Sequence, residues 1–264
     1  MEIRRYSDAS TFLNRAGDWL LENEAQNNLI LAIAHQLQAE KHPYEEPIYL
    51  ATIERDSEIS GCAWRTAPFK LGITELPIES IPMLVADVGG VFNQLPAVLG
   101  PESEALEFAK QWTRQTGVNY SPGMRQGIYS LERVRFPAQL APGSLRRAIM
   151  ADLPLISEWG ASFSRDVGLP GHQPLVNFER AIENGRFYLW QDGEPRSMAA
   201  ALGRTPNGIR IGMVYTPSEF RSQGYATALI ASLSQLLLDS GHRFCFLYTD
   251  LSNPISNKLY MRVG

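Results

Sequence analysis

The stretch "VYTPSEFRSQGYATALIAS", residues 214–232, carries the clearest structural signal in the chain. It begins with strand-forming residues, turns at Pro217 and enters an apolar run with helical spacing. Gly224 lies where the helix is expected to begin. Because glycine has no side chain and tolerates unusual dihedral angles, a ligand can approach the backbone closely there. The stretch therefore predicts a strand, a turn and a helix with an accessible start.

A helix start of this kind can hold an anion. Its first N–H groups are unpaired and carry a partial positive charge. Arg221 adds a fixed positive charge, and Ser222 and Thr227 add hydroxyl groups. A second interpretation is that glycine serves only the turn geometry and arginine only solubility. With one glycine and no Gly-Lys-Ser/Thr, the stretch is neither a P-loop nor a dinucleotide fingerprint, so both interpretations stay open on this motif alone.

A second polar pattern follows in "LYTDLSNPISNKLYMRVG", residues 247–264. Asn253, Ser256, Asn257 and Tyr260 recur at steps of three or four and share one face of a short helix. Asn253 before a proline is also a favourable N-cap. The pattern thus leaves Asn253 as a cap or a ligand contact, and Tyr260 as a core residue or a ligand contact.

The rest of the chain divides into two segments with the same order of elements. In the first we expect helical structure over 10–39, two strands within 45–68, a strand and short helix in 80–90, a helix over 102–116 ended by Gly117, and a strand over 126–137. In the second we expect helical structure over 144–159, a hairpin over 185–205 that turns at Asp192-Gly193, strands over 208–217 and 243–250, a helix over 225–239 ended by Gly241, and a short helix over 253–264.

Two short echoes favour a structural duplication. Arg65-Thr66-Ala67-Pro68 follows a strand in the first segment, and Arg204-Thr205-Pro206 follows one in the second. Between the segments lies "PAQLAPGS", residues 137–144, with two prolines and a glycine. We therefore expect two domains, residues 1–138 and 139–264.

Composition narrows the class of protein. With 264 residues, 44% hydrophobic and 20% charged, the chain is typical of a soluble globular protein. A net charge of −4 argues against a nucleic-acid partner. The start "MEIRRYSDAS" is unlike a signal peptide, and the apolar runs are shorter than the roughly 18–20 residues that span a bilayer. Cys62 and Cys245 suit buried thiols in a reducing compartment. We expect a cytoplasmic protein with no membrane partner.

The two motifs together resemble the acyl-CoA-binding half of the GNAT superfamily of N-acetyltransferases. That family begins a helix with Gln/Arg-x-x-Gly-x-Gly/Ala, which here is Arg221 to Ala226. It often follows with an Asn, a Tyr seven positions on and a Gly, which here are Asn253, Tyr260 and Gly264. Two motifs in this order, one helix and one strand apart, are much more specific than either alone. The clear resemblance covers about residues 185–264 and continues more faintly back to about 140.

The resemblance implies an α/β (α+β) fold of two GNAT-like domains, each a mixed, mostly antiparallel sheet flanked by helices. It implies that the pyrophosphate of coenzyme A lies on the amides of residues 222–226, and that the strand over 211–216 pairs with the pantetheine arm. The cofactor-binding residues that it implies are Met213, Val214, Tyr215, Thr216, Arg221, Ser222, Gln223, Gly224, Tyr225, Ala226, Thr227, Asn253, Ser256 and Asn257.

Tandem members of the family exist whose first half has lost the cofactor site. In "VLGPESEAL", which we compare with the cofactor loop, Pro101, Glu102 and Glu104 stand at a helix start. Carboxylates there complement the helix dipole but repel a pyrophosphate. We therefore expect a degenerate domain over 1–138 and one cofactor site in the domain over 139–264.

The activity that the resemblance implies is transfer of the acetyl group of acetyl-CoA to a primary amine of a small molecule or peptide. Tyr260 is then the general acid for the leaving thiolate, and a backbone N–H near Met213 or Val214 is the oxyanion donor. For the general base we name Asp250, with Glu219 as an alternative; either can equally be a surface or capping carboxylate. His172 borders the same region or is an ordinary loop residue. No His/Cys cluster suggests a metal.

Two other function classes remain open: a non-catalytic acyl-CoA-binding regulatory or interaction module, and a phosphate-binding domain for another nucleotide. The chain stops at Gly264, directly after the Tyr260 helix, where family members continue into a further strand. Either the sequence is cut short, or another segment completes the sheet edge. An open edge there would pair with a second copy, so we expect a monomer or a homodimer.

Overall fold

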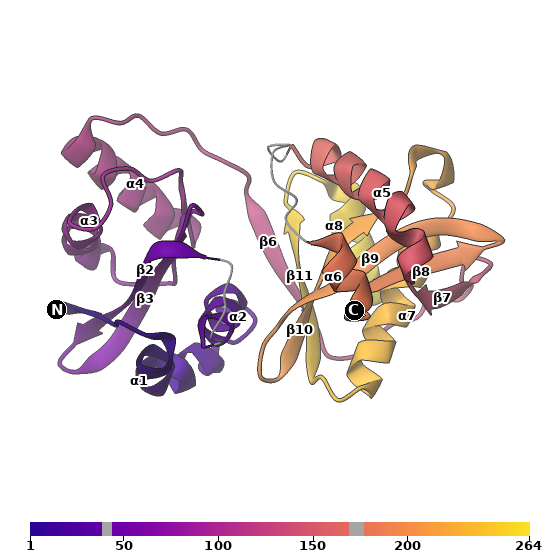
Figure 1. Ribbon diagram of the computed structural model, residues 1–264, viewed down its shortest axis with the longest axis horizontal. Coiled ribbons are helices and arrows are strands. Elements are labelled where there is room, and N and C mark those ends of the chain that lie inside the picture. Colours follow the sequence, from indigo (N-terminus) through magenta and orange to yellow (C-terminus); the bar gives the residue numbers. More distant parts are fainter. Residues whose placement is uncertain (39–43, 169–176) are drawn as a thin grey trace. The chain divides into compact units, whose positions relative to one another are not determined.

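A computed structural model describes residues 1–38, 44–168 and 177–264. The chain forms two compact units, Met1–Arg125 and Gln126–Gly264, and each is a β-sheet with helices on both faces (Figure 1). The predicted fold class is thereby confirmed. None of the helices in the described ranges is both long and apolar enough to span a membrane.

The first unit has a five-stranded sheet in the order β1-β2-β3-β4-β5. All neighbouring strands are antiparallel except β4 and β5, which are parallel. Helices α1 and α2 cover one face, and α3 and α4 cover the other (Figure 1). The elements are β1 (Glu2–Arg5), α1 (Ala9–Glu22), α2 (Asn28–Leu37), β2 (Glu45–Arg55), β3 (Glu58–Ala67), β4 (Leu71–Ile73), α3 (Ile81–Gly89), β5 (Val98–Leu99) and α4 (Glu102–Thr116).

The second unit has a six-stranded sheet in the order β6-β11-β10-β9-β8-β7, in which β10 and β11 are parallel. Helices α5 and α6 pack on one face, and α7 and α8 on the other. The elements are β6 (Gln126–Leu131), β7 (Ser144–Arg147), α5 (Leu153–Asp166), α6 (Phe178–Glu183), β8 (Phe187–Asp192), β9 (Glu194–Arg204), β10 (Gly208–Tyr215), α7 (Tyr225–Asp239), β11 (Phe244–Asp250) and α8 (Pro254–Val263).

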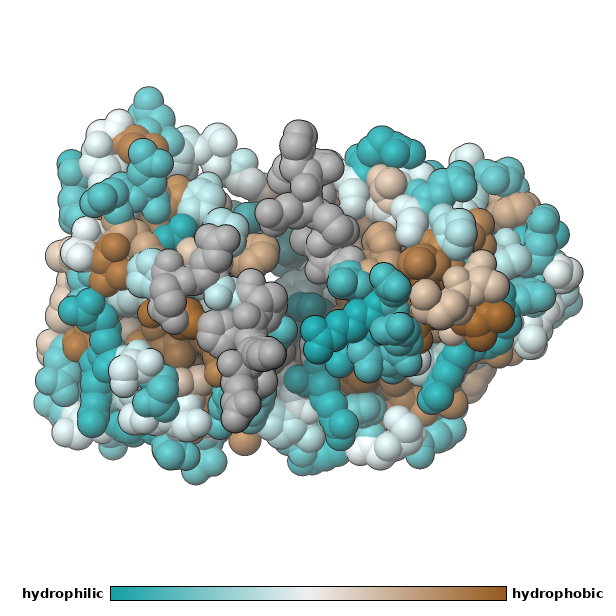
Figure 2. All heavy atoms as spheres, in the orientation of Figure 1, coloured by the Kyte–Doolittle hydropathy of each residue, from teal (hydrophilic) through white to brown (hydrophobic). Residues whose placement is uncertain are grey.

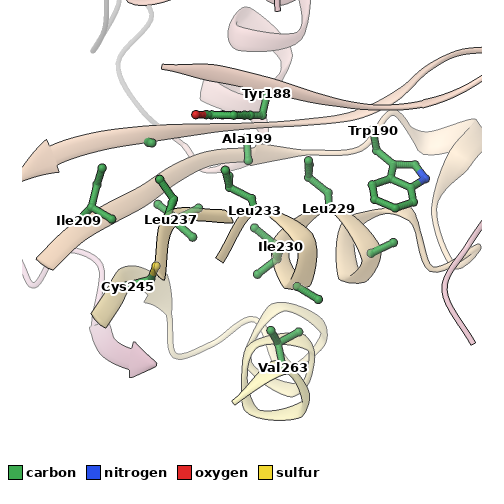
Figure 3. Close-up of a cluster of buried hydrophobic side chains, with 14 of the residues drawn as sticks. Tyr188, Trp190, Ala199, Ile209, Leu229, Ile230, Leu233, Leu237, Cys245 and Val263 are labelled. Atoms are coloured by element: carbon green, nitrogen blue, oxygen red, sulfur yellow. The ribbon is translucent and has the colours of Figure 1, made fainter. Parts of the chain in front are cut away.

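Strand β9 shows why the sheet of the second unit is buried on both faces. Side chains alternate between the faces of a strand, so Ala199 and Ala201 join the core under α7, while Met198 and Ala200 join the core under α5. The near-continuous apolar run that results is typical of a strand covered on both sides. Figure 3 shows Leu229, Leu233 and the sheet residue Ala199 meeting in the α7 core.

The two units repeat one topology. The strand order β7-β8-β9-β10-β11 matches β1-β2-β3-β4-β5, and in each case the last two strands are parallel. Arg65 and Arg204 lie near the ends of β3 and β9, the third strand of each repeat. The predicted duplication is therefore confirmed at the level of strand order.

The division between the units differs from the expected one at 138. Strand β6 pairs with β11 in antiparallel register along its whole length, from Gln126 to Leu131. Backbone pairing thus places residues 126–131 in the second sheet, and the boundary falls before β6 instead of within residues 137–144. The same pairing covers the edge of β11 with an upstream segment. This agrees with our expectation that another segment of the chain could complete that sheet edge.

Several local expectations also change. Residues 144–147 form β7, and the helix expected from Ser144 begins only at Leu153. The strand expected within residues 80–90 is absent, since α3 begins at Ile81, and the strands β1 and β4 were not expected. These strands have three or four residues, which is too short for a clear period of two. The hairpin turn at Asp192-Gly193 and the left-handed Gly117 that ends α4 are confirmed.

The visible surface agrees with the composition. Hydrophilic side chains dominate the visible face of each unit, and apolar side chains form small clusters between them (Figure 2). Both cysteines are buried, free thiols.

Candidate active site

The parallel strands β10 and β11 part from each other partway along their length. They pair only between Gly208–Arg210 and Phe244–Phe246, although β10 continues to Tyr215 and β11 to Asp250. The gap therefore opens toward the carboxyl ends of both strands, which is where α/β sheets bind ligands. We call this gap the β10–β11 opening.

A bulge in β10 shapes one side of the opening. The register with β9 shifts between Gly212 and Tyr215, and Met213 has a positive φ of 53°. The bulge sends Met213 into the α5 core, whereas Ile211 faces the α7 core. Bulges of this kind redirect backbone groups near functional sites, so the backbone near Met213 and Val214 is suited to an oxyanion-donor role.

The residues after the bulge are held by protein contacts. The ring of Tyr215 packs on Trp159 with 6.2 Å between centroids. The hydroxyl groups of Thr216 and Ser197 lie 2.8 Å apart. Val214 packs at the margin of the α7 core. The side chains of these three predicted cofactor contacts thus support the strand, and the backbone oxygens of Tyr215 and Thr216 accept from Ser197 Oγ and Arg221 Nε.

The start of α7 presents unpaired backbone donors. Gly224 is the N-cap in a left-handed conformation, with φ 86° and no side-chain cap, and Ser222 also has a positive φ of 63°. Within the described part of the chain, no hydrogen-bond acceptor is recorded for the N–H groups of residues 222–227, which include Ala226 and Thr227. A Cβ at Gly224 would lie 3.7 Å from that of Ala141, so the dihedral angle, and not lack of space, calls for glycine.

Arg221 is already engaged on both sides of its guanidinium. Its Nε donates to the carbonyl oxygen of Thr216 at 2.9 Å, and its Nη2 lies 2.7 Å from Oδ2 of Asp166 at the end of α5. Both side chains of this ion pair are 50% exposed, so the pair contributes at most about 1 kcal/mol. Arg221 can therefore exchange Asp166 for a ligand phosphate at little cost.

Two further predicted residues act locally. Gln223 donates from Nε2 to the carbonyl oxygen of Glu219 at 2.9 Å and closes the turn. The buried Tyr225 donates its hydroxyl to Oδ2 of Asp192 at 2.8 Å, and this hydrogen bond raises the pKa of Tyr225. The ring of Tyr225 thus anchors α7 to the β8–β9 hairpin, while its backbone N–H has no recorded acceptor within the described residues.

Helix α8 carries the second motif. Asn253 accepts from the backbone N–H of Ser256 at 3.1 Å and is a true N-cap. Asn257 donates from Nδ2 to the carbonyl oxygens of Asp250 and Leu251, at 3.0 and 3.3 Å. Its Oδ1 is buried and has no partner in the described chain. An unpaired buried acceptor is costly, and a ligand N–H would satisfy it.

Tyr260 lies at the inner end of the opening. It lines a small cavity together with Ile211 of β10 and Leu247 of β11, and its ring lies 6.3 Å from that of Tyr129 on β6. Burial raises the pKa of Tyr260 to about 12. The phenol therefore stays protonated at neutral pH and can donate a proton, as a general acid must.

The carboxylates considered as bases are differently placed. Asp250 accepts from the N–H and Oγ of Ser252 at 2.8 and 2.7 Å, and these bonds lower its pKa. Glu219 accepts from Ser218. A carboxylate with a lowered pKa is a weak proton acceptor near pH 7. The hydrogen bonds from Ser252 to Asp250 are those of a carboxylate that stabilises a turn. His172 lies outside the described residues. Among those described, no three His, Cys, Asp or Glu side chains gather as metal ligands.

The first unit differs at the matching place. By topology, α4 follows β5 and corresponds to α8, so our comparison of Pro101, Glu102 and Glu104 with the cofactor loop was misplaced. The true counterpart is "TELPIES", residues 74–80, which precedes α3 and contains no glycine. Moreover, a Cβ at Gly100 would lie 2.6 Å from the carbonyl oxygen of Ile73, so the chain after β5 stays close against β4.

The second unit thus combines parallel strands that part with an uncapped helix start beside them. Residues 154–264 match the model of the acetyltransferase (GNAT) family. No curated protein matches the chain in sequence.

Solved structures extend the fold likeness to both units. A Drosophila protein has a TM-score of 0.65 at 13% identity, covering 99% of this chain and 94% of its own. A GNAT-family acetyltransferase from Colwellia psychrerythraea has a TM-score of 0.52 at 12% identity, and the match covers 100% of this chain and 95% of that protein. A GCN5-related N-acetyltransferase from Sphaerobacter thermophilus has a TM-score of 0.52 at 16% identity, and the match covers 98% of this chain and 90% of that protein. At such identities the likeness concerns the fold alone.

Proposed function

We propose that this protein is an N-acetyltransferase that moves the acetyl group of acetyl-CoA to a primary amine of a small molecule or peptide. The observation that carries the proposal is the β10–β11 opening beside the uncapped start of α7. Free N–H groups and the helix dipole suit a pyrophosphate, and an opened strand offers backbone groups to an extended arm. One ligand, coenzyme A, has both chemical features.

The remaining contacts support the same ligand. Arg221 can turn from Asp166 to a phosphate oxygen. The unpaired Oδ1 of Asn257 suits an amide N–H of the pantetheine arm. We propose that residues 1–125 form a degenerate repeat without a cofactor site, because its matching loop has no glycine and Gly100 packs against Ile73. Two buried free thiols support a cytoplasmic location.

In the proposed reaction a neutral amine attacks the thioester carbonyl. The N–C bond forms, the C–S bond breaks, and Tyr260 gives its proton to the leaving thiolate. A backbone N–H at the β10 bulge stabilises the oxyanion, and much of the rate comes from holding amine and thioester together. Since Asp250 is held by Ser252, we propose that the amine loses its surplus proton to water and that the Tyr260 phenolate regains a proton from water.

The direct test is release of the coenzyme A thiol from acetyl-CoA across a panel of primary amines, with mass spectrometry of the products. The proposal predicts thiol release that depends on one amine class and a product heavier by one acetyl group. Tight acetyl-CoA binding with no release for any amine would instead favour a non-catalytic acyl-CoA-binding module.

A further inference from the structure

One arginine of the first unit is buried without a negative partner. Arg65 lies on β3 beside the last β3–β4 pair, Trp64 with Gly72, and only 7% of the residue is exposed. Burial lowers its pKa, but an arginine keeps its charge at neutral pH. Among the described residues, no carboxylate forms an ion pair with it. Since a buried charge is costly unless it is paired, the folded chain leaves this cation uncompensated.

The contacts of Arg65 fix its guanidinium and leave one end of it free. Its Nε donates to the carbonyl oxygen of Phe69 at 3.0 Å, and its Cζ lies 4.1 Å from the centroid of the Phe92 ring. The Phe92 ring packs in turn against the ring of Tyr49, with 6.2 Å between centroids. The guanidinium is thus held at Nε and on one face, whereas Nη1 and Nη2 have no recorded acceptor within the described chain.

Both free nitrogens of Arg65 reach solvent. In the part of the chain that the structure describes, Oδ1 of Asn257 is the one fully buried side-chain nitrogen or oxygen without a hydrogen-bond partner. The unpaired Nη1 and Nη2 of Arg65 therefore keep accessible surface. Because the whole residue is only 7% exposed and Phe92 covers one face, a ligand can approach only along the narrow edge that these two nitrogens form.

The second unit offers an internal comparison. Arg204 precedes Thr205 at the end of β9, as Arg65 precedes Thr66 on β3. Arg204 is exposed, whereas Arg65 is buried. Both repeats thus carry an arginine near the end of their third strand, but only the first repeat encloses it. Solubility explains an exposed arginine and does not explain the buried one.

We propose that Arg65 binds the carboxylate group of a small organic acid, end-on through Nη1 and Nη2. A carboxylate is flat, its two oxygens match the fork of a guanidinium, and its single negative charge balances the single buried positive charge. A tetrahedral phosphate places oxygens outside the plane of the fork, where Phe92 and the buried surroundings leave little room. The first unit then has a ligand site of its own, which does not depend on the proposed acetyl transfer.

Nuclear magnetic resonance titration of the full chain with acetate tests the site. The Nε–H of Arg65 is hydrogen-bonded to Phe69, so its signal reports on the guanidinium. We expect acetate to shift this signal saturably, with a Kd on the order of 1 mM. Acetamide has nearly the same shape without the charge and should leave the signal unchanged at the same ionic strength. The absence of a saturable shift with acetate overturns the proposal, as does an equal response to acetamide or tighter binding of inorganic phosphate.

Two variants locate the acetate site, with the backbone amide signal of Phe69 as the readout. Arg65→Lys keeps the charge but removes the fork, and should bind acetate at least about tenfold more weakly. Arg204→Gln is the matched control and should keep the affinity of the unaltered protein. Unchanged affinity in Arg65→Lys, or a loss in Arg204→Gln, would contradict the site. If Arg65→Lys fails to fold, the acetate and acetamide titrations of the unaltered protein decide.

Discussion

The Nδ2 of Asn257 donates to the backbone carbonyl oxygen of Asp250 at 3.0 Å, which fixes the orientation of the Asn257 amide. Because Leu251 offers a second carbonyl to the same nitrogen, Oδ1 must point away from the end of β11. That oxygen is buried and has no partner within the described ranges. Helix α8 thus holds a buried acceptor that an incoming N–H can satisfy.

We expect Asn257→Ala to weaken acetyl-CoA binding about five- to tenfold, because the acceptor for a ligand N–H is lost. The cost in unfolding free energy should stay below about 2 kcal/mol, since two hydrogen bonds and one unsatisfied oxygen disappear together. Calorimetry and chemical denaturation give the two values. Asn184→Ala, which removes a comparable amide-to-carbonyl hydrogen bond at the end of α6, is the control. Unchanged affinity of the Asn257 variant would remove the oxygen from the site.

Arg221 and Asp166 should respond to substitution in opposite ways. Arg221→Gln removes a charge available to a phosphate, and we expect acetyl-CoA to bind at least tenfold more weakly. Asp166→Asn releases Arg221 from its exposed ion pair, so binding should be unchanged or tighter, with a stability change below about 1 kcal/mol. Titration of both variants with acetyl-CoA at one ionic strength measures the two affinities and tests this prediction. Weaker binding in Asp166→Asn would mean that the ion pair itself shapes the site.

Strand β6 is expected to be indispensable to the second unit. A fragment of residues 126–264 keeps the β6–β11 pairing, whereas a fragment of residues 139–264 exposes the edge of β11 and loses the contact of Tyr129 with Tyr260. We expect the shorter fragment to melt at a lower temperature and to self-associate through the open edge. Thermal unfolding and light scattering compare them. Equal behaviour would show that β6 contributes nothing to this fold.

Tyr260→Phe should lower turnover by about 10²-fold or more while leaving acetyl-CoA affinity within about twofold, as expected for loss of a general acid. Single-turnover kinetics and calorimetry separate the two quantities. A parallel loss of both would assign Tyr260 to packing alone.

The pKa of Tyr260 also predicts a pH dependence of stability. Burial raises this pKa from 10.0 to about 12. Below pH 10 the phenol is protonated in both folded and unfolded chains, so its contribution is constant. Between pH 10 and 12 the unfolded chain ionises first, and stability falls as pH rises. Denaturation curves up to pH 11 should show a smaller alkaline loss for the Phe variant than for the unaltered protein.

Much of the second unit could be predicted from the sequence because its signals are local. The apolar spacing of α7, the Asp192-Gly193 turn and the Asn253 cap each depend on residues close in the chain. The two motifs also marked the correct helix starts at Gly224 and Asn253.

What could not be predicted depends on pairing between distant segments. Arg221 forms an ion pair with Asp166, and the ring of Tyr260 contacts that of Tyr129. The residues of each pair are far apart in the sequence, and no periodic pattern predicts such contacts. Strand β6 alternates clearly, but alternation does not say which sheet edge a strand joins. The same limit explains the misplaced comparison of residues 101–104, since only the topology shows that α4 corresponds to α8.

The most direct test of the central claim is acetyl-CoA calorimetry on Gly224→Glu beside Gly224→Gln. Both side chains impose the same backbone strain at a φ of 86°, worth about 1–2 kcal/mol, and only Glu adds negative charge at the helix start. We predict that the Gln variant retains measurable binding and the Glu variant shows none at millimolar ligand. Equal affinities in the two variants would contradict an anion site at the start of α7.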